Sequence, residues 1–290
     1  MSHNELISLG DVGKLSQLRV LLCAYNLIAG IPQDLQALTS LQVLDVKSNL
    51  LLNSGNSLIA KMISGASAVS EMVSLVHLDL SLNKMSVAPS LAKLTRLVSC
   101  NLSKNVLTEF PQGAASLGSL EVLDLSDNQI PSIPLLDIEG MSKLQRLNMQ
   151  HNQLRYISAS IHHLQSLQQF VASHNQLQVV PACLGYMPSL TLLDLESNCI
   201  DTIENQAFST ALERLTLKHN QLVHVPPLDR LPHLSVLDLS FNRIEELPAL
   251  PPNLKDLRVS HNALTVRPPS TRSVTYPAML CLLTPSIARS

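Results

Sequence analysis

One pattern, Leu-x-x-Leu-x-Leu-x-x-Asn-x-Leu, returns eleven times along the chain. Successive asparagines are separated by 20 to 34 residues, and most of the separations are 22 to 24 residues. A unit of this length cannot bury its apolar side chains alone, so neighbouring units must stack and share a core. The sequence therefore predicts an elongated repeat array. The asparagines are Asn26, Asn49, Asn83, Asn105, Asn128, Asn152, Asn175, Asn198, Asn220, Asn242 and Asn262.

The positions of each repeat have distinct chemistry. Leucine fills position one in every repeat, and positions four and six are apolar throughout. Apolar residues that alternate around positions four to six have the period of a short strand with one face inward. The asparagine at position nine follows this strand. There the backbone N–H and C=O groups lose their strand partners while the chain is still buried in the interior of the repeat. The asparagine amide can both donate and accept a hydrogen bond there. Aspartate has no donor, and leucine has neither a donor nor an acceptor.

Beyond the asparagine, most repeats continue to an apolar residue followed by proline, as in Ile31-Pro32, Phe110-Pro111 and Val180-Pro181. Proline gives no amide to a ladder, so it marks the exit toward the convex side. This pattern resembles intracellular leucine-rich repeat proteins of the I-P-x-x-(I/L)-x-x-L type, which include the Ras-group scaffolds. The last repeat is similar to the short bacterial-effector type.

The resemblance implies an α/β solenoid, a curved right-handed leucine-rich repeat horseshoe of about eleven repeats. A parallel β-sheet would line its concave face, with irregular, 3-10 or short helical segments on the convex side. It also implies a non-enzymatic protein-binding module. The motif survey agrees, because no nucleophile triad, phosphate-binding glycine loop, paired-cysteine site or HExxH motif is present.

We expect three regions in the chain. Residues 1–14 would form an N-terminal cap or half-repeat, residues 15–268 the repeat array, and residues 269–290 a tail that is disordered or caps the last repeat. The array carries an insertion, residues 52–74, whose apolar spacing suits a helix broken near Gly65, or alternatively an extended convex segment or a docking loop. Its apolar residues are Leu58, Ile59, Met62, Ile63, Val69, Met72 and Val73.

Charge and cysteine content narrow the classes of function. The formal net charge of −2 and a pI near 6.5 predict no general affinity for nucleic acid or for anionic membranes. Five cysteines lie without terminal clusters, and no secretory signal precedes the repeats. The sequence therefore predicts a reduced, cytoplasmic protein without a cofactor, monomeric or part of a hetero-complex.

The concave face is the expected binding surface, because positions two, three, five, seven and eight point outward there. Position five is rich in acids and amides, and position eight is the most variable. Aspartate between leucines is also an ordinary solvated residue, so a purely structural reading stays open. The candidate partner-binding residues are Tyr25, Asp79, Glu121, Asp124, Asp127, His151, His174, Asp194, Glu196 and Phe241.

His151 and His174 fall in the same column of adjacent strands, close enough to share a ligand or a proton. A zinc site normally takes at least three protein ligands, and no third ligand lies between them, so no metal site is predicted. The function that fits these observations is a protein-binding scaffold. The alternatives are a regulatory subunit of a signalling enzyme such as a protein phosphatase, and a bacterial-effector-like host-protein binder.

Overall fold

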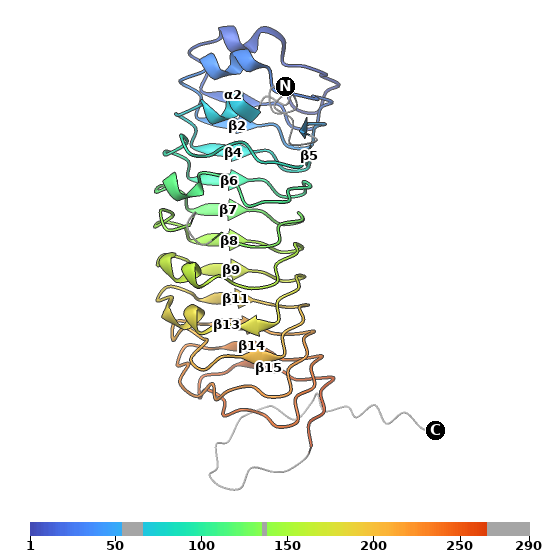
Figure 1. Cartoon of the computed structure of the whole chain (residues 1–290), viewed down its shortest axis with the longest axis vertical. Coiled ribbons are helices and arrows are strands. Elements are labelled where there is room, and N and C mark those ends of the chain that lie inside the picture. The colour runs from blue at the N-terminus through green and yellow to red at the C-terminus, as the bar shows by residue number, and fades with distance from the viewer. Residues whose placement is uncertain (54–65, 135–137, 266–290) are drawn as a thin grey trace, which may run out of the picture.

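The computed structural model describes residues 1–53, 66–134 and 138–265. Within them an eleven-stranded, all-parallel sheet runs the length of the molecule, with each repeat adding one strand in chain order (Figure 1). Its strands are β1 (Val20–Leu22), β2 (Val43–Asp45), β4 (His77–Asp79), β6 (Ser99–Asn101), β7 (Val122–Asp124), β8 (Arg146–Asn148), β9 (Gln169–Val171), β11 (Leu192–Asp194), β13 (Arg214–Thr216), β14 (Val236–Asp238) and β15 (Asp256–Arg258).

Short elements cover the opposite side of the coil. Among the described residues they are 3-10 turns, two-residue strands and one short helix, which is the mixture expected from the proline-containing segments. They are η1 (Gly10–Lys14), η2 (Gln33–Ala37), η3 (Ala114–Ser116), η4 (Ala159–His163), η5 (Ala182–Tyr186), α2 (Ala66–Ser70), β3 (Leu52–Asn53), β5 (Lys84–Met85), β10 (Val179–Val180) and β12 (Thr202–Ile203). Pairing of β3 with β5 and of β10 with β12 links neighbouring coils on this side.

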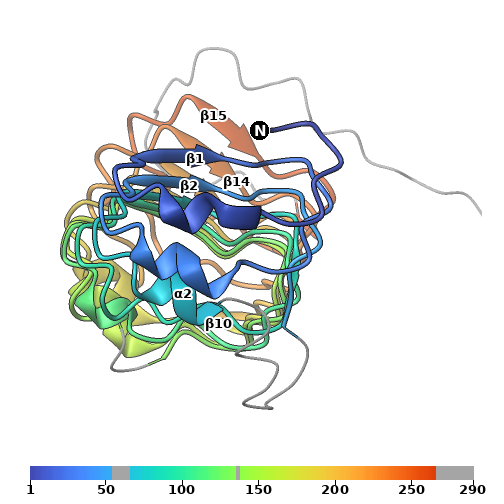
Figure 2. The same cartoon turned by 90° about the horizontal axis from the view of Figure 1, so that it is seen from above.

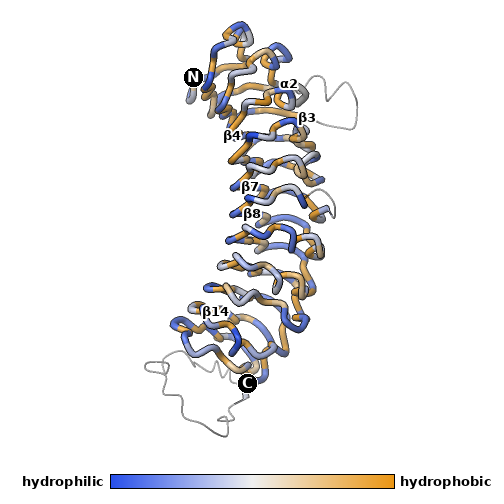
Figure 3. Tube along the Cα trace, turned by 90° about the vertical axis from the view of Figure 1, so that its left-hand side faces the viewer, coloured by the Kyte–Doolittle hydropathy of each residue, from blue (hydrophilic) through white to orange (hydrophobic). Residues whose placement is uncertain are grey.

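The column bends gently, with the strand side on the inside of the curve (Figure 3). Seen down its length, successive coils superimpose into a ring of backbone around one core (Figure 2). The leucines of positions one, four and six fill this core, and nearly all of them are completely buried. Phe170 replaces leucine at position four in one repeat and is also fully buried. The predicted solenoid with a parallel sheet is therefore confirmed.

A second line of buried groups follows the sheet, made of the repeat asparagines. The Asn128 amide donates to the carbonyl oxygens of Leu125 and Ser126 in its own repeat, at 3.0 and 3.1 Å, and to Leu102 in the preceding repeat at 3.1 Å. Its oxygen accepts the Leu107 N–H at 3.0 Å. Each asparagine from Asn49 to Asn262 makes the same set of contacts with its neighbour. These side chains therefore bond each coil to the preceding one where the strand ladder stops.

Position eight is a turn position and does not belong to the outward strand face, so the expectation from the sequence was wrong on this point. The residue there has a left-handed backbone in all eleven repeats, with φ between 52° and 58°. This conformation costs an L-residue roughly 1–2 kcal/mol. It swings the next residue, the asparagine, back into the interior, where its hydrogen bonds offset the cost. A tendency of aspartate and histidine toward this conformation was a usable signal in this column.

The N-terminal residues form hydrogen bonds with the first repeat that resemble those between successive repeats. The Leu6 N–H donates to the Asn26 side-chain oxygen at 3.1 Å, and the His3 N–H donates to the Ala24 carbonyl at 2.9 Å. Leu9 is buried, whereas Ile7 is 74% exposed. Leu22 and Tyr25 remain nearly half exposed. The N-terminal residues thus leave part of the first strand exposed.

Only part of the predicted insertion can be placed. Leu52 and Asn53 form β3, and within the stretch around α2 the residues Val69 and Met72 are fully buried while Val73 is exposed. The apolar group from Leu58 to Ile63 lies outside the described residues, as do residues 266–290, which include the expected tail.

Candidate functional site

Strand register aligns the position-five side chains into one column along the sheet. Asp79 is in register with Asn101, Asn101 with Asp124, and Asp124 with Asn148. Neighbouring parallel strands are about 4.8 Å apart, so the amides separate the two carboxylates by about 10 Å. This alternation limits repulsion between Asp79 and Asp124, whereas Asp45 lies directly beside Asp79 in the register.

Each acid of this column also has a local structural task. In Asp124, Oδ1 accepts the Ser126 N–H at 2.9 Å and the Ser126 hydroxyl at 2.7 Å. Asp79 accepts the Ser81 N–H in the same way, and Asp194 accepts that of Glu196. The bond caps the strand just before the left-handed turn. Asn101 and Asn148 make it too, so the task needs an oxygen but no charge. Reversal of charge at Asp124 would therefore disturb the turn as well as the surface.

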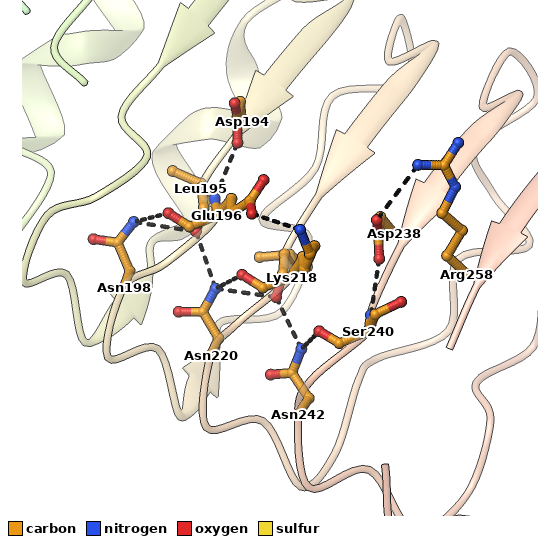
Figure 4. Close-up of polar contacts among 11 residues, drawn as sticks. Asp194, Leu195, Glu196, Asn198, Lys218, Asn220, Asp238, Ser240, Asn242 and Arg258 are labelled. Carbon is orange, nitrogen blue, oxygen red and sulfur yellow. Dashed lines mark hydrogen bonds and ion pairs between the residues drawn. The ribbon is translucent and has the colours of Figure 1, made fainter. Parts of the chain in front are cut away.

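The charged residues of the strand side divide into two electrostatic zones. At the C-terminal end the acids have partners: Lys218 lies 2.8 Å from Glu196, and Arg258 lies 3.9 Å from Asp238 (Figure 4). Arg258 also lies 2.7 Å from Asp256. In the central zone no ion pair forms within the described residues. We call this zone the central acidic surface, and its residues are Asp79, Glu121, Asp124 and Asp127.

Asp194 lies at the border of the two zones and differs from the other carboxylates. Burial raises its pKa above the usual value, the hydrogen bond from the Glu196 N–H opposes this shift, and the Glu196 carboxylate adds to it. The folded state therefore binds a proton on the Asp194 carboxylate more tightly than the unfolded state does. The contribution of Asp194 to folding stability consequently falls as the pH rises through its pKa.

Asp194→Asn tests this assignment. The amide oxygen can still accept the Glu196 N–H, and the charge that burial disfavours is removed. We expect the variant to be at least as stable as the wild type at pH 7, with the largest difference above pH 6 and a smaller one near pH 4. Urea unfolding at several pH values measures this. A variant that is less stable at pH 7 than at pH 4, relative to the wild type, would contradict the assignment.

Rings stack along position eight. His151 and His174 have ring centroids 4.2 Å apart and nearly parallel planes. Phe241 lies between His219 and His261, with centroid distances of 4.2 and 4.1 Å. The sequence placed these residues in one column but did not show that their rings stack. Phe241 is 37% exposed, so its edge is available to a partner although its two faces are covered.

Tyr25 belongs to a separate apolar surface at the N-terminal end. Its ring stacks on His3 at 4.3 Å, and the Lys47 ammonium lies 6.0 Å from its centroid. Beside it, Val20 and Leu22 of β1 are exposed along a hollow of about 310 Å³. Tyr25 follows β1 and Phe241 follows β14, so the two residues lie near opposite ends of the sheet. The structure therefore does not bring all the candidate residues into one site.

Within the described residues there is no group of three or more metal-ligating side chains. The helical segments there are at most five residues long, and none could cross a membrane. The described cysteines are free: Cys23 and Cys100 are buried, Cys183 is half-buried and Cys199 is exposed. Burial raises the pKa of the Cys100 thiol to about 12, so it stays protonated and unreactive.

Comparison with known proteins agrees with this architecture. The family model described as "Leucine rich repeat" matches residues 95–154, 119–177 and 188–244. Human podocan-like protein 1 is 32% identical over 240 residues, which cover 80% of this chain and 40% of that protein. Mouse lumican is 34% identical over 184 residues, covering 60% of this chain and 52% of that protein.

A solved leucine-rich repeat protein of Leptospira interrogans superposes with a TM-score of 0.79 and 29% identity, over 91% of this chain and 66% of that one. The chain belongs to the leucine-rich repeat superfamily. It spans about half or less of the length of these curated relatives. Leucine-rich repeat arrays are in general non-enzymatic protein-binding modules, and this is the level of function that the comparisons support.

Proposed function

We propose that the chain is an intracellular, non-enzymatic scaffold that binds a folded protein with a basic surface across its strand side. The observation that supports this is the central acidic surface. There, each aspartate at position five has one oxygen fixed by a backbone N–H, and no cation of the described residues forms an ion pair with it. A pre-organised charge of this kind loses little entropy on binding, and it favours partners of opposite charge.

The ion-paired zone supports the same choice by contrast. The carboxylates of Glu196 and Asp238 already have cationic neighbours, so a partner would have to displace them. An intracellular location is proposed because the described cysteines are free and one of them is exposed, as in proteins kept under reducing conditions.

Neutralisation of the central acidic surface is the direct test. The variant Asp79→Asn/Glu121→Gln/Asp124→Asn/Asp127→Asn keeps an oxygen at every position, so the capping bonds can form while the charges are lost. We expect quantitative affinity purification from source-cell lysate to lose at least one partner that the wild type retains. Because the contact is electrostatic, binding by the wild type should also weaken as salt is raised.

The matched control is Glu109→Gln/Asp201→Asn/Asp229→Asn/Glu246→Gln, which changes the net charge equally outside the eleven-stranded sheet. Both variants must show the circular dichroism and melting behaviour of the wild type. Equal loss of partners from both would mean that net charge alone matters, and an unchanged list from the first would refute the proposal. One stoichiometric partner would favour a regulatory subunit over a scaffold.

A further inference from the structure

The N-terminal residues make the contacts of positions six to eleven of a coil. The Asn4 amide donates to the carbonyl oxygens of Met1 and Ser2, both at 3.0 Å, as each repeat asparagine does to the residues three and two before it. His3 has the left-handed backbone of position eight, with a φ of 58°. The Met1 carbonyl in turn accepts the Asn26 amide at 3.0 Å. Met1 therefore lies at position six, and no described residue fills positions one to five of this layer.

β1 is an edge strand of the large sheet and pairs there with β2. On the β2 side, the Arg19 carbonyl accepts the Val43 N–H at 3.0 Å, and the Cys23 N–H donates to β2 at 2.7 Å. Backbone groups point to alternate sides along a strand, so the N–H and C=O groups of Val20 and Leu22 face away from β2. In the following coils the corresponding groups bond the preceding strand. The edge of β1 is therefore a template for one further strand.

The apolar hollow of about 310 Å³ opens beside this edge, and we call it the N-terminal hollow. It is lined by Met1, Val12, Leu15 and Leu18 together with the three residues of β1. Leu15 is 54% exposed, whereas Leu38, the equivalent residue of the next coil, is fully buried. In the described coils, leucines that a strand directs inward cover such residues. Side chains that a further strand directed inward would enter this hollow and remove its apolar lining from water.

The outward side chains of β1 are apolar as well. Val20 at position three and Leu22 at position five are 50% and 45% exposed. Position five is polar in most other coils, and Leu22 is the only leucine in that column. A strand paired with β1 would place its own third and fifth residues about 4.8 Å from these two side chains. The edge therefore favours a strand with apolar residues on its outward face too.

The shape of the N-terminal hollow limits what can enter it. The hollow lies between η1, which contributes Val12, and β1 (Figure 2). At the end of β1 it is bounded by Met1 and by the turn that follows, whose Leu6 N–H bonds the Asn26 side chain at 3.1 Å. A second folded copy that paired its own β1 here would bring its η1 into the layer that this η1 already fills. An extended segment has no such coil attached, so the hollow favours a single strand.

We propose that the N-terminal hollow binds an extended, apolar segment of a partner protein, which adds to β1 as a further strand in the direction of the rest of the sheet. Backbone hydrogen bonds to Val20 and Leu22 supply affinity, and side chains that enter the hollow supply specificity. The segment needs about five residues, with leucine or a similar side chain at its first and fourth positions, as in the described coils. This surface is separate from the central acidic surface, and the inference does not rest on the function proposed above.

Fluorescence anisotropy with a labelled peptide tests the proposal. The probe is a peptide of the sequence PHLSVLD, residues 232–238 of this chain, with fluorescein at its N-terminus and an amidated C-terminus. We expect saturable binding to the full chain, which Val20→Lys/Leu22→Lys weakens about tenfold or more because the apolar contact is lost. N-methylation of the peptide at Leu237, whose amide faces β1, should weaken binding as strongly. N-methylation at Val236, whose amide faces away, should change the affinity by less than about twofold.

The matched control is Ile7→Lys/Leu27→Lys, which makes the same change at two exposed apolar residues outside the hollow. We expect it to bind the peptide within about twofold of the wild type, and both variants to keep the wild-type melting temperature. In hydrogen exchange, the peptide should protect the amides of Val20 and Leu22. Absence of saturable binding, equal weakening by both variants, or equal effects of the two methylations would overturn the proposal. So would a concentration-dependent dimer that Val20→Lys/Leu22→Lys dissociates, because a second copy would then occupy the hollow.

Discussion

Asn128→Asp should destabilise the array severely, by about 3 kcal/mol or more at pH 7. The Asn128 amide donates to three carbonyl oxygens in two repeats, and a carboxylate in its place would face all three without a proton to donate. Burial and these carbonyls would raise the pKa of the introduced carboxyl in the folded state. The deficit relative to the wild type should therefore shrink as the pH falls, because the folded state then gains the proton.

The control is the same chemical change at a position that tolerates it. The Asn148 side-chain oxygen accepts the Gln150 N–H, a task that aspartate performs elsewhere in the column. We expect Asn148→Asp to cost less than about 1 kcal/mol. Urea unfolding followed by circular dichroism measures both. Similar losses from the two variants would show that the asparagine contacts do not carry the stability assigned to them.

Phe170→Ala is the second change with a large expected effect, about 3–5 kcal/mol. The ring is fully buried in the middle of the array, where both flanking coils pack on it. Its removal leaves a cavity that the leucines around it cannot fill, because their backbones are fixed by the strand register. A repeat array transmits such a defect to adjacent coils, so the cooperativity of unfolding should fall as well.

Leu82→Ala offers the comparison for this core variant, since Leu82 occupies position eight and is 38% exposed. We expect a change within about 0.5 kcal/mol there. Thermal and urea unfolding of both proteins give the difference directly. A Phe170→Ala protein that melts like the wild type would mean that the core at this repeat is not packed as described.

The architecture was predictable because its chemistry repeats. A leucine at position one and an asparagine at position nine return in every coil, so each supports the interpretation of the others. The left-handed turn at position eight was harder to see, because only its aspartate and histidines favour that conformation and the other residues range from Lys104 to Phe241. What they share is a backbone conformation, imposed by the need to return the following asparagine to the interior.

The surface was less predictable, because it depends on which side chains face each other across coils. The sequence placed Glu196 among the candidate partner-binding residues, but its ion pair with Lys218 needs the register of two adjacent turns. Likewise, the second role of Asp124, as acceptor for the Ser126 N–H, depends on the turn that follows the strand. Composition gives the net charge of the chain, and the strand register decides which charges on a face remain unpaired.

Hydroxyl-radical footprinting of the purified complex tests most directly whether the strand side is the binding surface. Aromatic and imidazole side chains report on both sides of the coil: Tyr25, His151, His174 and Phe241 on the strand side, and Tyr156 and Tyr186 outside the sheet, 56% and 66% exposed. We predict protection by the partner at His151 and His174, next to the central acidic surface, with Tyr156 and Tyr186 labelled as in the free protein. Protection of Tyr156 and Tyr186 with unchanged labelling of the strand-side residues would contradict the account.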